Sequence, residues 1–324
     1  MNILVCGIGS IGRRHIRILK ELGVKNFIAY RSEKNGKKIS DDSIKEIFDL
    51  NEIADHKIDG ALITNPTSLH VKTATTLATA GIPMLIEKPL GKDLDGIDEL
   101  QKIVTEKNVQ VLMGYNFIYH PAIMEMKKLI AEEKIGRIVA ARSQFGTYMP
   151  GWHKEEDYKK SYAALPELGG GVVLTSIHEQ NYLTDFFGKV TDVMAMEVGG
   201  SEIGIDSEEA VEILMKHESG VVSNVHLNFF QKPYFRNCQL IGNDGTMFWD
   251  FMKPEITILK KDNAETIKLG KDAMELLDVS YKEQLKHFLD VISKNVEPRI
   301  TLQDGINDMK VALKILTDIK RNLN

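Results

Sequence analysis

The feature that most limits what this chain can fold into is a glycine-rich turn near residue 10. Residues 7–12 read GxGxxG, directly after the apolar run 3–6 and before a helical pattern over 13–22. In such a turn the glycines permit a tight bend, a close approach of pyrophosphate and close helix–strand packing, and the helix N-terminus favours a phosphate. The turn therefore predicts a dinucleotide-binding βαβ unit. Its candidate cofactor contacts are Gly7, Gly9, Ser10, Ile11 and Gly12.

Short apolar strands alternate with helical patterns through the first third of the chain. This rhythm is typical of a parallel, doubly wound sheet. The expected strands are 3–6, 26–30, 60–64, 84–86 and 109–113, and the expected helices are 13–22, 69–80 and 94–106. We therefore predict a Rossmann domain over residues 1–118.

From residue 138 onward the rhythm changes to long segments in which apolar and polar residues alternate. Turns such as 218–220 and 243–245 separate these segments and favour hairpins. The expected strands are 138–148, 190–198, 210–217 and 220–230, and the expected helices are 177–187, 279–293 and 304–321. The predicted fold class is α/β, with a second, α+β domain over residues 119–324 built on an open, mostly antiparallel sheet.

Composition and charge exclude several kinds of partner. The formal net charge is −5, and the sequence lacks the basic patch or stripe that nucleic-acid binding requires. Cys6 and Cys238 are far apart and belong to no Cys/His cluster, so we expect neither a disulfide framework nor a metal site. No apolar run reaches the length of a membrane span, and no secretory leader is visible. We expect a cytoplasmic protein without a membrane partner.

The end of the second predicted strand bears on the choice of dinucleotide. NAD-binding domains carry an acidic residue there, which accepts hydrogen bonds from the ribose hydroxyls. This strand instead ends in Arg31 and Ser32, a guanidinium and a hydroxyl that suit a 2′-phosphate. We therefore expect NADP(H) to be preferred, with NAD(H) as the second option. The alternative is a solvated loop in which Arg31 only stacks on adenine.

Two residues are candidates for the chemistry itself. Lys88 follows a parallel strand, beyond whose carboxyl end ligands bind, and a Lys there can hydrogen-bond a hydroxyl and assist proton transfer. His178 stands near the start of a helix after the glycine-rich turn 169–171. Taken singly, each has a plainer interpretation, a solvated amine for Lys88 and a structural histidine for His178.

Five motifs occur together along essentially the whole chain. They are Gly7 to Gly12, Thr64 to His70, Glu87 to Leu90, Gly114 to Asn116 with His120 and Pro121, and Gly169 to Gly171 followed by His178 to Asn181. With these motifs in this order the chain resembles the Gfo/Idh/MocA oxidoreductases, mostly NAD(P)-dependent dehydrogenases and reductases of sugars, inositols and their derivatives.

The resemblance implies roles for particular residues. Lys88 would orient the substrate hydroxyl and His178 would be the acid or base. Further cofactor contacts would come from Thr64, Asn65, Pro66, His70, Glu87 and Lys88. The candidate substrate contacts are Tyr115, Asn116, Trp152, Tyr158, Tyr162, Thr175 and His178. The resemblance also implies a homodimer or homotetramer formed through the C-terminal sheet.

Two positions depart from the family pattern, which has an Asp shortly before the His and often another three residues after it. This chain has Thr175 and Asn181 there. The loss of a carboxylate near Lys88 and His178 either changes the acid–base assignment or is compensated by Glu179.

The stretch 148–165 is rich in aromatic residues, hydroxyls and lysines. Aromatic faces with polar rims suit a sugar ring, and Lys154, Lys159 or Lys160 could meet a carboxylate or phosphate. The plainer alternative is a surface loop whose aromatic side chains pack on the sheet. The stretch loosely resembles a branch of the family found with nonulosonic acid and surface-glycan enzymes.

The expected function is hydride transfer between a nicotinamide cofactor and a hydroxyl or ketone carbon of a sugar-like substrate, in surface-glycan or nonulosonic acid metabolism. The alternative is a non-catalytic NAD(P)-binding sensor or regulator of the same fold, motivated by Thr175 and Asn181.

Overall fold

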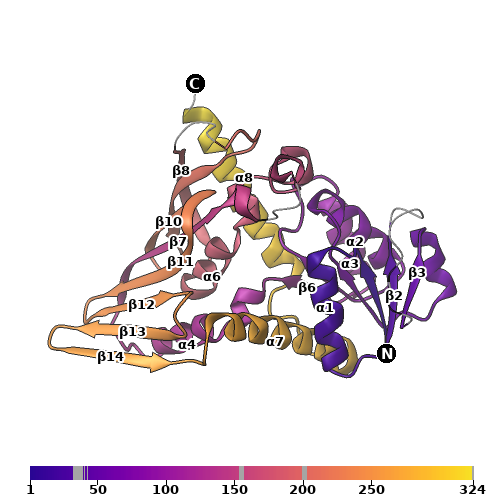
Figure 1. The fold of residues 1–324 in the computed structure, drawn as a ribbon, viewed down its shortest axis with the longest axis horizontal. Coiled ribbons are helices and arrows are strands. Elements are labelled where there is room, and N and C mark those ends of the chain that lie inside the picture. Colours follow the sequence, from indigo (N-terminus) through magenta and orange to yellow (C-terminus); the bar gives the residue numbers. More distant parts are fainter. Residues whose placement is uncertain (32–38, 40, 42, 153–156, 199–202, 323–324) are drawn as a thin grey trace. The chain divides into compact units, whose positions relative to one another are not determined.

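The computed structural model describes residues 1–31, 39, 41, 43–152, 157–198 and 203–322. These residues form two sheets, each with its own helices (Figure 1). Within the described part of the chain, no helix has both the length and the apolar character that a membrane crossing requires.

The first sheet, sheet A, is parallel and has the strand order β3-β2-β1-β4-β5-β6. Its strands are β1 (Asn2–Cys6), β2 (Asn26–Tyr30), β3 (Ile44–Ile47), β4 (Gly60–Ile63), β5 (Met84–Glu87) and β6 (Val111–Gly114). Its helices include α1 (Ser10–Glu21), α2 (His70–Thr79) and α3 (Ile97–Glu106). This order confirms the predicted Rossmann sheet. Because it reverses between β1 and β4, it opens a crevice at the carboxyl ends of these two strands.

Helices cover both faces of sheet A, so its inner strands are buried on both sides. On one face Ile3, Val5 and Leu62 pack against Leu19 of α1 and Phe288 of α7 (Ala273–Lys294). Helices α2 and α3 contact each other, and α2 also contacts β4 and β5. Double-sided burial explains why the strands read as continuous apolar runs rather than alternating ones.

The second sheet, sheet B, has the order β14-β13-β12-β11-β7-β10-β9-β8 and is antiparallel except where β10 pairs with β7. Its strands are β7 (Ile138–Tyr148), β8 (Val190–Glu197), β9 (Ala210–His217), β10 (Val222–Asn228), β11 (Phe230–Gly242), β12 (Thr246–Asp250), β13 (Glu255–Lys260) and β14 (Asn263–Lys268). The remaining helices are α4 (Pro121–Ala131), α5 (Val172–Thr175), α6 (His178–Phe187) and α8 (Leu302–Asn322). The open, mostly antiparallel sheet expected from the sequence is therefore confirmed.

Sheet B has one buried and one exposed face. Val193, Ile213 and Val225 are buried on the helix side, where α5 and α6 contact the sheet. On the opposite face Met194 and Leu214 are 67% and 48% exposed and lie side by side across β8 and β9. The alternation seen in the sequence thus arises from one covered and one uncovered face.

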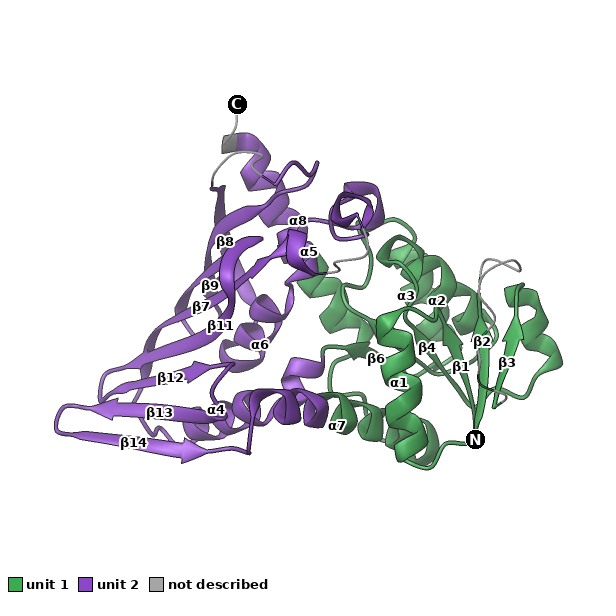
Figure 2. Cartoon of the chain, viewed as in Figure 1, with its two compact units in different colours: residues 1–115, 281–309 green, residues 116–280, 310–324 purple. Residues whose placement is uncertain are grey.

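The chain divides into two compact units, shown in green and purple in Figure 2. Unit 1 consists of residues 1–115 and 281–309, and unit 2 of residues 116–280 and 310–324. The sequence-based division places one boundary, between residues 118 and 119. In the structure the chain enters unit 2 after residue 115, returns to unit 1 within α7 and enters unit 2 again within α8. The boundary of the folding domains stays a prediction.

Candidate active site

The glycine turn after β1 has the geometry that a dinucleotide site needs. Gly7 has φ +104°, and a Cβ there would lie 2.6 Å from the backbone nitrogen of Asn65. A Cβ on Gly12 would lie 2.2 Å from the carbonyl oxygen of Gly7, whereas one on Gly9 would have no atom within 4 Å. The turn is therefore tight at its two outer glycines and open at the middle one. With Gly9, Ser10 and Ile11 at the N-terminus of α1, these residues fit a pyrophosphate.

The loop after β4 is tied to this turn. The Thr64 hydroxyl donates to the Gly7 carbonyl oxygen at 2.6 Å, and the Asn65 amide donates to the Thr73 hydroxyl at 2.9 Å. Pro66 is exposed. Two predicted cofactor segments, far apart in the sequence, are thus joined at adjacent strand ends.

The Glu-Lys-Pro turn after β5 is anchored from α1. Glu87 Oε1 lies 2.7 Å from Nε2 of the fully buried His15, and its Oε2 accepts from the Lys88 backbone N–H at 3.3 Å. Lys88 itself is partly buried. His15 therefore holds Glu87 in place.

His70 joins the loop after β4 to the turn after β5. Its Nε2 lies 2.8 Å from the Asn65 carbonyl oxygen and its Nδ1 lies 2.8 Å from that of Pro89. Burial lowers the pKa of His70 below its ordinary value, although the two carbonyl oxygens act in the opposite direction. Since both ring nitrogens face backbone carbonyls, His70 acts on the neighbouring loops by holding them together.

Arg31, at the end of β2, has an acidic neighbour. Its Nη1 donates to Oε2 of Glu46 on β3 at 2.6 Å, and Glu46 Oε1 accepts from the Ile39 backbone N–H at 3.0 Å. Both side chains of this ion pair are mostly buried. Ser32, the other residue predicted to select NADP(H), lies outside the described residues.

His178 belongs to unit 2 and is the first residue of α6. It is 7% exposed, and its ring is tilted against that of Phe117 with centroids 4.8 Å apart. Thr175, at the end of α5, is partly buried. Lys88 belongs to unit 1, so the two predicted catalytic residues come from different units.

Glu208 holds the glycine turn that leads to His178. Its carbonyl oxygen accepts from Val172 N–H at 3.1 Å, and its Oε1 accepts from Val173 N–H at 3.0 Å. A Cβ on Gly171 would lie 2.2 Å from the Glu208 carboxylate, so this position needs glycine. Burial raises the pKa of Glu208 to about 7. No sequence pattern pointed to this residue, because it lies in an irregular segment between two strands.

Glu179, the residue after His178, forms an ion pair within unit 2. It is fully buried, and its Oε1 lies 2.7 Å from Nε of Arg236 on β11. In unit 2 the carboxylate considered as compensation for Thr175 and Asn181 is thus paired with Arg236, and its role beside His178 stays a prediction.

Two predicted substrate contacts are buried in their own units. Tyr115, in unit 1, is fully buried, and its pKa is raised by burial and by the nearby charge of Asp308. Asn116, in unit 2, is 2% exposed and donates from its amide to the Ser280 hydroxyl at 2.8 Å. Both side chains hold the chain where it passes from β6 to unit 2.

The aromatic stretch packs partly on the second sheet. The Trp152 indole N–H donates to the Thr147 hydroxyl at 2.8 Å, and its ring meets Phe229 edge-on. The Tyr158 hydroxyl donates to the Ile203 carbonyl oxygen at 2.8 Å. Tyr162 is 47% exposed. Lys154 lies outside the described residues.

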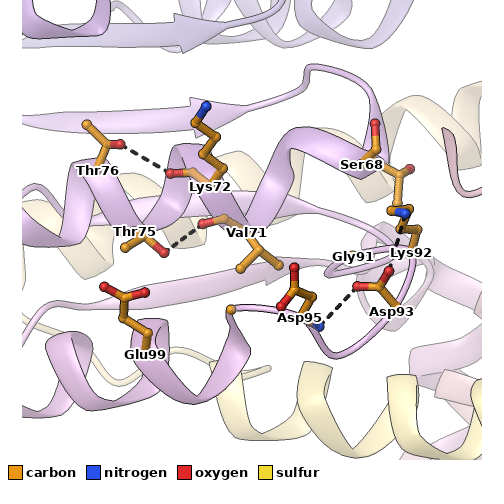
Figure 3. A pocket seen from close by; sticks show the side chains of 12 residues that line it. Ser68, Val71, Lys72, Thr75, Thr76, Gly91, Lys92, Asp93, Asp95 and Glu99 are labelled. Carbon is orange, nitrogen blue, oxygen red and sulfur yellow. Dashed lines mark hydrogen bonds and ion pairs between the residues drawn. The ribbon is translucent and has the colours of Figure 1, made fainter. Parts of the chain in front are cut away.

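A pocket of about 420 Å³ opens between α2 and α3 (Figure 3). Its Thr75 and Thr76 hydroxyls donate to carbonyl oxygens of their own helix, and Lys92 pairs with Asp93. It contains none of the predicted site residues. In the described part of the chain, no three His, Cys, Asp or Glu side chains are grouped as a metal site.

Comparison with known proteins identifies the family. The profile of an oxidoreductase family with an NAD-binding Rossmann fold matches residues 1–115, and that of the GFO/IDH/MocA C-terminal domain matches residues 123–248. The chain belongs to the Gfo/Idh/MocA family of oxidoreductases. The expected resemblance, the dinucleotide-binding domain and the assignment as an oxidoreductase are thereby confirmed.

Several members of the Gfo/Idh/MocA family are similar to this chain. A 1,5-anhydro-D-fructose reductase of Ensifer adhaerens is 26% identical over 302 residues, 89% of this chain and 84% of the relative. A D-xylose 1-dehydrogenase (NADP(+)) of Haloferax volcanii is 22% identical, covering 80% of this chain and 77% of the relative. A levoglucosan dehydrogenase solved with NADH and levoglucosan has a TM-score of 0.84 at 16% identity, covering 99% and 97% of the two chains, and shows the shared fold.

The raised pKa of Glu208 leads to a prediction about stability. The protonated carboxyl stabilises the folded state fully below the ordinary pKa of 4.5, and this contribution is lost as the pH rises through about 7. Glu208→Gln keeps an acceptor for Val173 and cannot ionise. We expect its melting temperature, relative to wild type, to be higher at pH 8 than at pH 5.

Melting curves at the two pH values check this expectation. Glu265→Gln, which makes the same charge change at a partly buried carboxylate of β14, is the control and should show no such dependence. An equal offset for Glu208→Gln at both pH values would contradict the assignment.

Proposed function

We propose that this protein transfers a hydride between a nicotinamide dinucleotide and a hydroxyl or ketone carbon of a sugar or sugar derivative. The observation that carries the proposal is the grouping at one edge of sheet A. The glycine turn follows β1, the Asn65 loop follows β4 and Lys88 follows β5, and these three strands are neighbours. The named activities of the relatives, which include a sugar reductase and a sugar dehydrogenase, favour a sugar substrate.

The proposed roles follow from the chemistry of each side chain. When bound, the dinucleotide supplies or accepts the hydride. Lys88 donates a hydrogen bond to the substrate oxygen and polarises it. His178 takes the hydroxyl proton during oxidation and returns it during reduction. Contacts on both sides of Lys88 hold its turn in place. Glu87 contacts His15, and Pro89 contacts His70, which also contacts Asn65.

The proposal includes NADP(H) as the preferred cofactor. A cation at the end of β2 supports this preference, because a guanidinium binds a phosphate through several directed N–H groups. Glu46 opposes it, since it already pairs with Arg31. We infer a modest preference, in which the 2′-phosphate competes with Glu46 for the same guanidinium.

The proposal also covers the pathway and the assembly. The aromatic stretch supports surface-glycan precursors, nonulosonic acids among them, as substrates. The exposed face of sheet B, with Met194, Met196 and Leu214, supports a homodimer or homotetramer formed through that face.

The first prediction concerns Lys88. We expect Lys88→Ala to lower kcat about 10²- to 10⁴-fold while the Kd for the dinucleotide changes less than about threefold, because the amine acts on the substrate oxygen. Absorbance at 340 nm with a panel of sugars, inositols and nonulosonic acids measures turnover. Lys92→Ala, an exposed lysine beside Asp93, is the control. An unchanged kcat in Lys88→Ala, or an equal loss of dinucleotide binding, would show that Lys88 does not have this role. If wild type turns over no sugar in the panel, the alternative function, a non-catalytic NAD(P)-binding sensor or regulator, would be favoured.

The second prediction concerns Glu46. We expect wild type to bind NADPH about tenfold more tightly than NADH, equivalent to about 1.4 kcal/mol. Glu46→Gln should tighten NADPH binding about threefold or more and leave NADH nearly unchanged. Titrations that follow nicotinamide fluorescence measure both. Glu21→Gln, which makes the same charge change on α1, is the control; preference for NADH in wild type would refute the 2′-phosphate site.

The third prediction concerns assembly. Light scattering after gel filtration should give a dimer or tetramer for wild type and a monomer for the double substitution Met196→Lys and Leu214→Lys, because burying the two added cations of each copy in an apolar interface costs their hydration. Met274→Lys, which places a cation at an exposed position on α7, is the control. A wild-type monomer, or an unchanged mass for the double variant, would refute an interface on this face.

A further inference from the structure

A buried ion pair stands directly beside His178 in unit 2. Glu179, the next residue on α6, is 0% exposed, and Arg236 of β11 is 6% exposed. Arg236 Nε lies 2.7 Å from Glu179 Oε1, and its Nη2 donates to Oε2 at 3.4 Å. Two nitrogens of one planar group therefore meet both oxygens of the carboxylate, which restricts how the first turn of α6 can rotate.

The Arg236 guanidinium is also held by two aromatic rings. Its Cζ lies 4.3 Å from the ring centroid of Phe117 and 4.5 Å from that of Phe145, the residue opposite it on β7. A guanidinium stacks favourably on aromatic faces, and it does so more strongly where water is excluded. Although burial opposes its charge, Glu179 raises the pKa of Arg236 above its ordinary value, so the group stays protonated.

Phe117 connects this cation to His178. Its ring contacts the guanidinium at 4.3 Å and the His178 ring at 4.8 Å. His120 stacks on the same ring with an interplanar angle of 10°, and burial and Arg236 lower its pKa to about 3. Arg236 thus acts on His178 in two ways. It holds the backbone at the start of α6 through Glu179, and it contacts the Phe117 ring that lies against the His178 ring.

Burying such a pair is expensive, and a buried ion pair is weak evidence for stability. The two nearby positions where the family pattern has carboxylates are Thr175 and Asn181, neither of which carries a charge. Apolar side chains would fill this space at a lower cost in hydration, so the buried pair points to a role other than stability.

We propose that Arg236 is a positioning residue that sets the orientation of the His178 ring through Glu179 and Phe117. The proposal rests on the proposed function, in which His178 moves the substrate proton. It assigns Arg236 no contact with substrate or cofactor.

The test replaces the pair by apolar side chains of similar volume, in the double substitution Glu179→Met and Arg236→Met. Such replacements are often neutral or stabilising, whereas removing one partner leaves a buried charge. We expect the double variant to melt within a few degrees of wild type and to bind the dinucleotide with unchanged Kd. Its kcat for a sugar found in the panel should fall tenfold or more, with KM changed less than threefold.

A second readout needs no substrate. The protein has nine histidines, and labelling them with ¹³C at Cε1 gives resolvable NMR signals, of which His178 is identified by its loss in His178→Asn. We expect the His178 signal to shift in the double variant. The double substitution Lys127→Met and Asp185→Asn, which removes an ion pair between α4 and the same helix α6, is the matched control and should leave the signal in place.

The outcomes separate the two proposals. An unchanged His178 signal and kcat in the double variant would overturn the positioning role. Failure of every sugar to react would refute the proposed function, and the NMR signal would still decide whether Arg236 positions His178. If the double variant does not fold, Phe117→Leu, which keeps the ion pair and removes the connecting ring, should lower kcat tenfold or more with KM changed less than threefold, and an unchanged kcat would overturn the proposal. The single variant Arg236→Lys keeps the positive charge, but its ammonium cannot stack flat between two rings, so we expect its kcat to lie below that of wild type. A wild-type kcat for Arg236→Lys would contradict the proposal.

Discussion

Close contact between the backbone loops that follow β1 and β4 governs the geometry of unit 1. A Cβ at Gly7 or Gly12 would collide with backbone atoms of Asn65 or Gly7, so the loops approach only because these side chains are missing. The Thr64 hydroxyl then binds the Gly7 carbonyl, and His70 extends the connection to Pro89. Displacing one of these loops would therefore move the pyrophosphate turn and the Lys88 turn together.

In unit 2 the equivalent rigidity comes from two buried carboxyl groups. Glu208 fixes the turn before α5 through two backbone N–H groups, and Arg236 fixes the start of α6 through Glu179. Carboxylates so far from water are retained only where directed hydrogen bonds or a cation compensate for lost hydration. The segment that carries His178 is thus held at both ends by polar contacts, with apolar packing between them.

Local patterns predicted the sheets well, because the inner strands of sheet A are buried on both faces and those of sheet B on one. Helix α1 begins at Ser10, three residues before the expected start, since Gly9 takes the N-cap position. Strand β3, the ranges of strands β11 to β14 and helix α4 were not anticipated, although the hairpin turn 243–245 between β11 and β12 was. The motifs also led to the Lys88 and His178 segments and to the family.

The contacts that hold these segments could not be read from the sequence. Arg236 meets Phe145 only because of the register between β11 and β7, and Glu46 meets Arg31 only because β3 lies beside β2. The partners in these pairs are 15 and 91 positions apart in the sequence, and no periodic pattern extends over such distances. The sequence alone therefore could not predict which side chains form these pairs.

The return of the chain to unit 1 has a consequence for how this protein can be divided. Leu285 and Phe288, on the second half of α7, belong to the same apolar cluster as Ile3, Val5 and Leu62. A fragment that stops after β6 would keep α1 but lose α7, which leaves part of this face of the Rossmann sheet and its aliphatic side chains open to water. The nucleotide-binding unit can therefore not be cut out as one continuous segment. Its last part, residues 281–309, is synthesised only after residues 116–280 of unit 2.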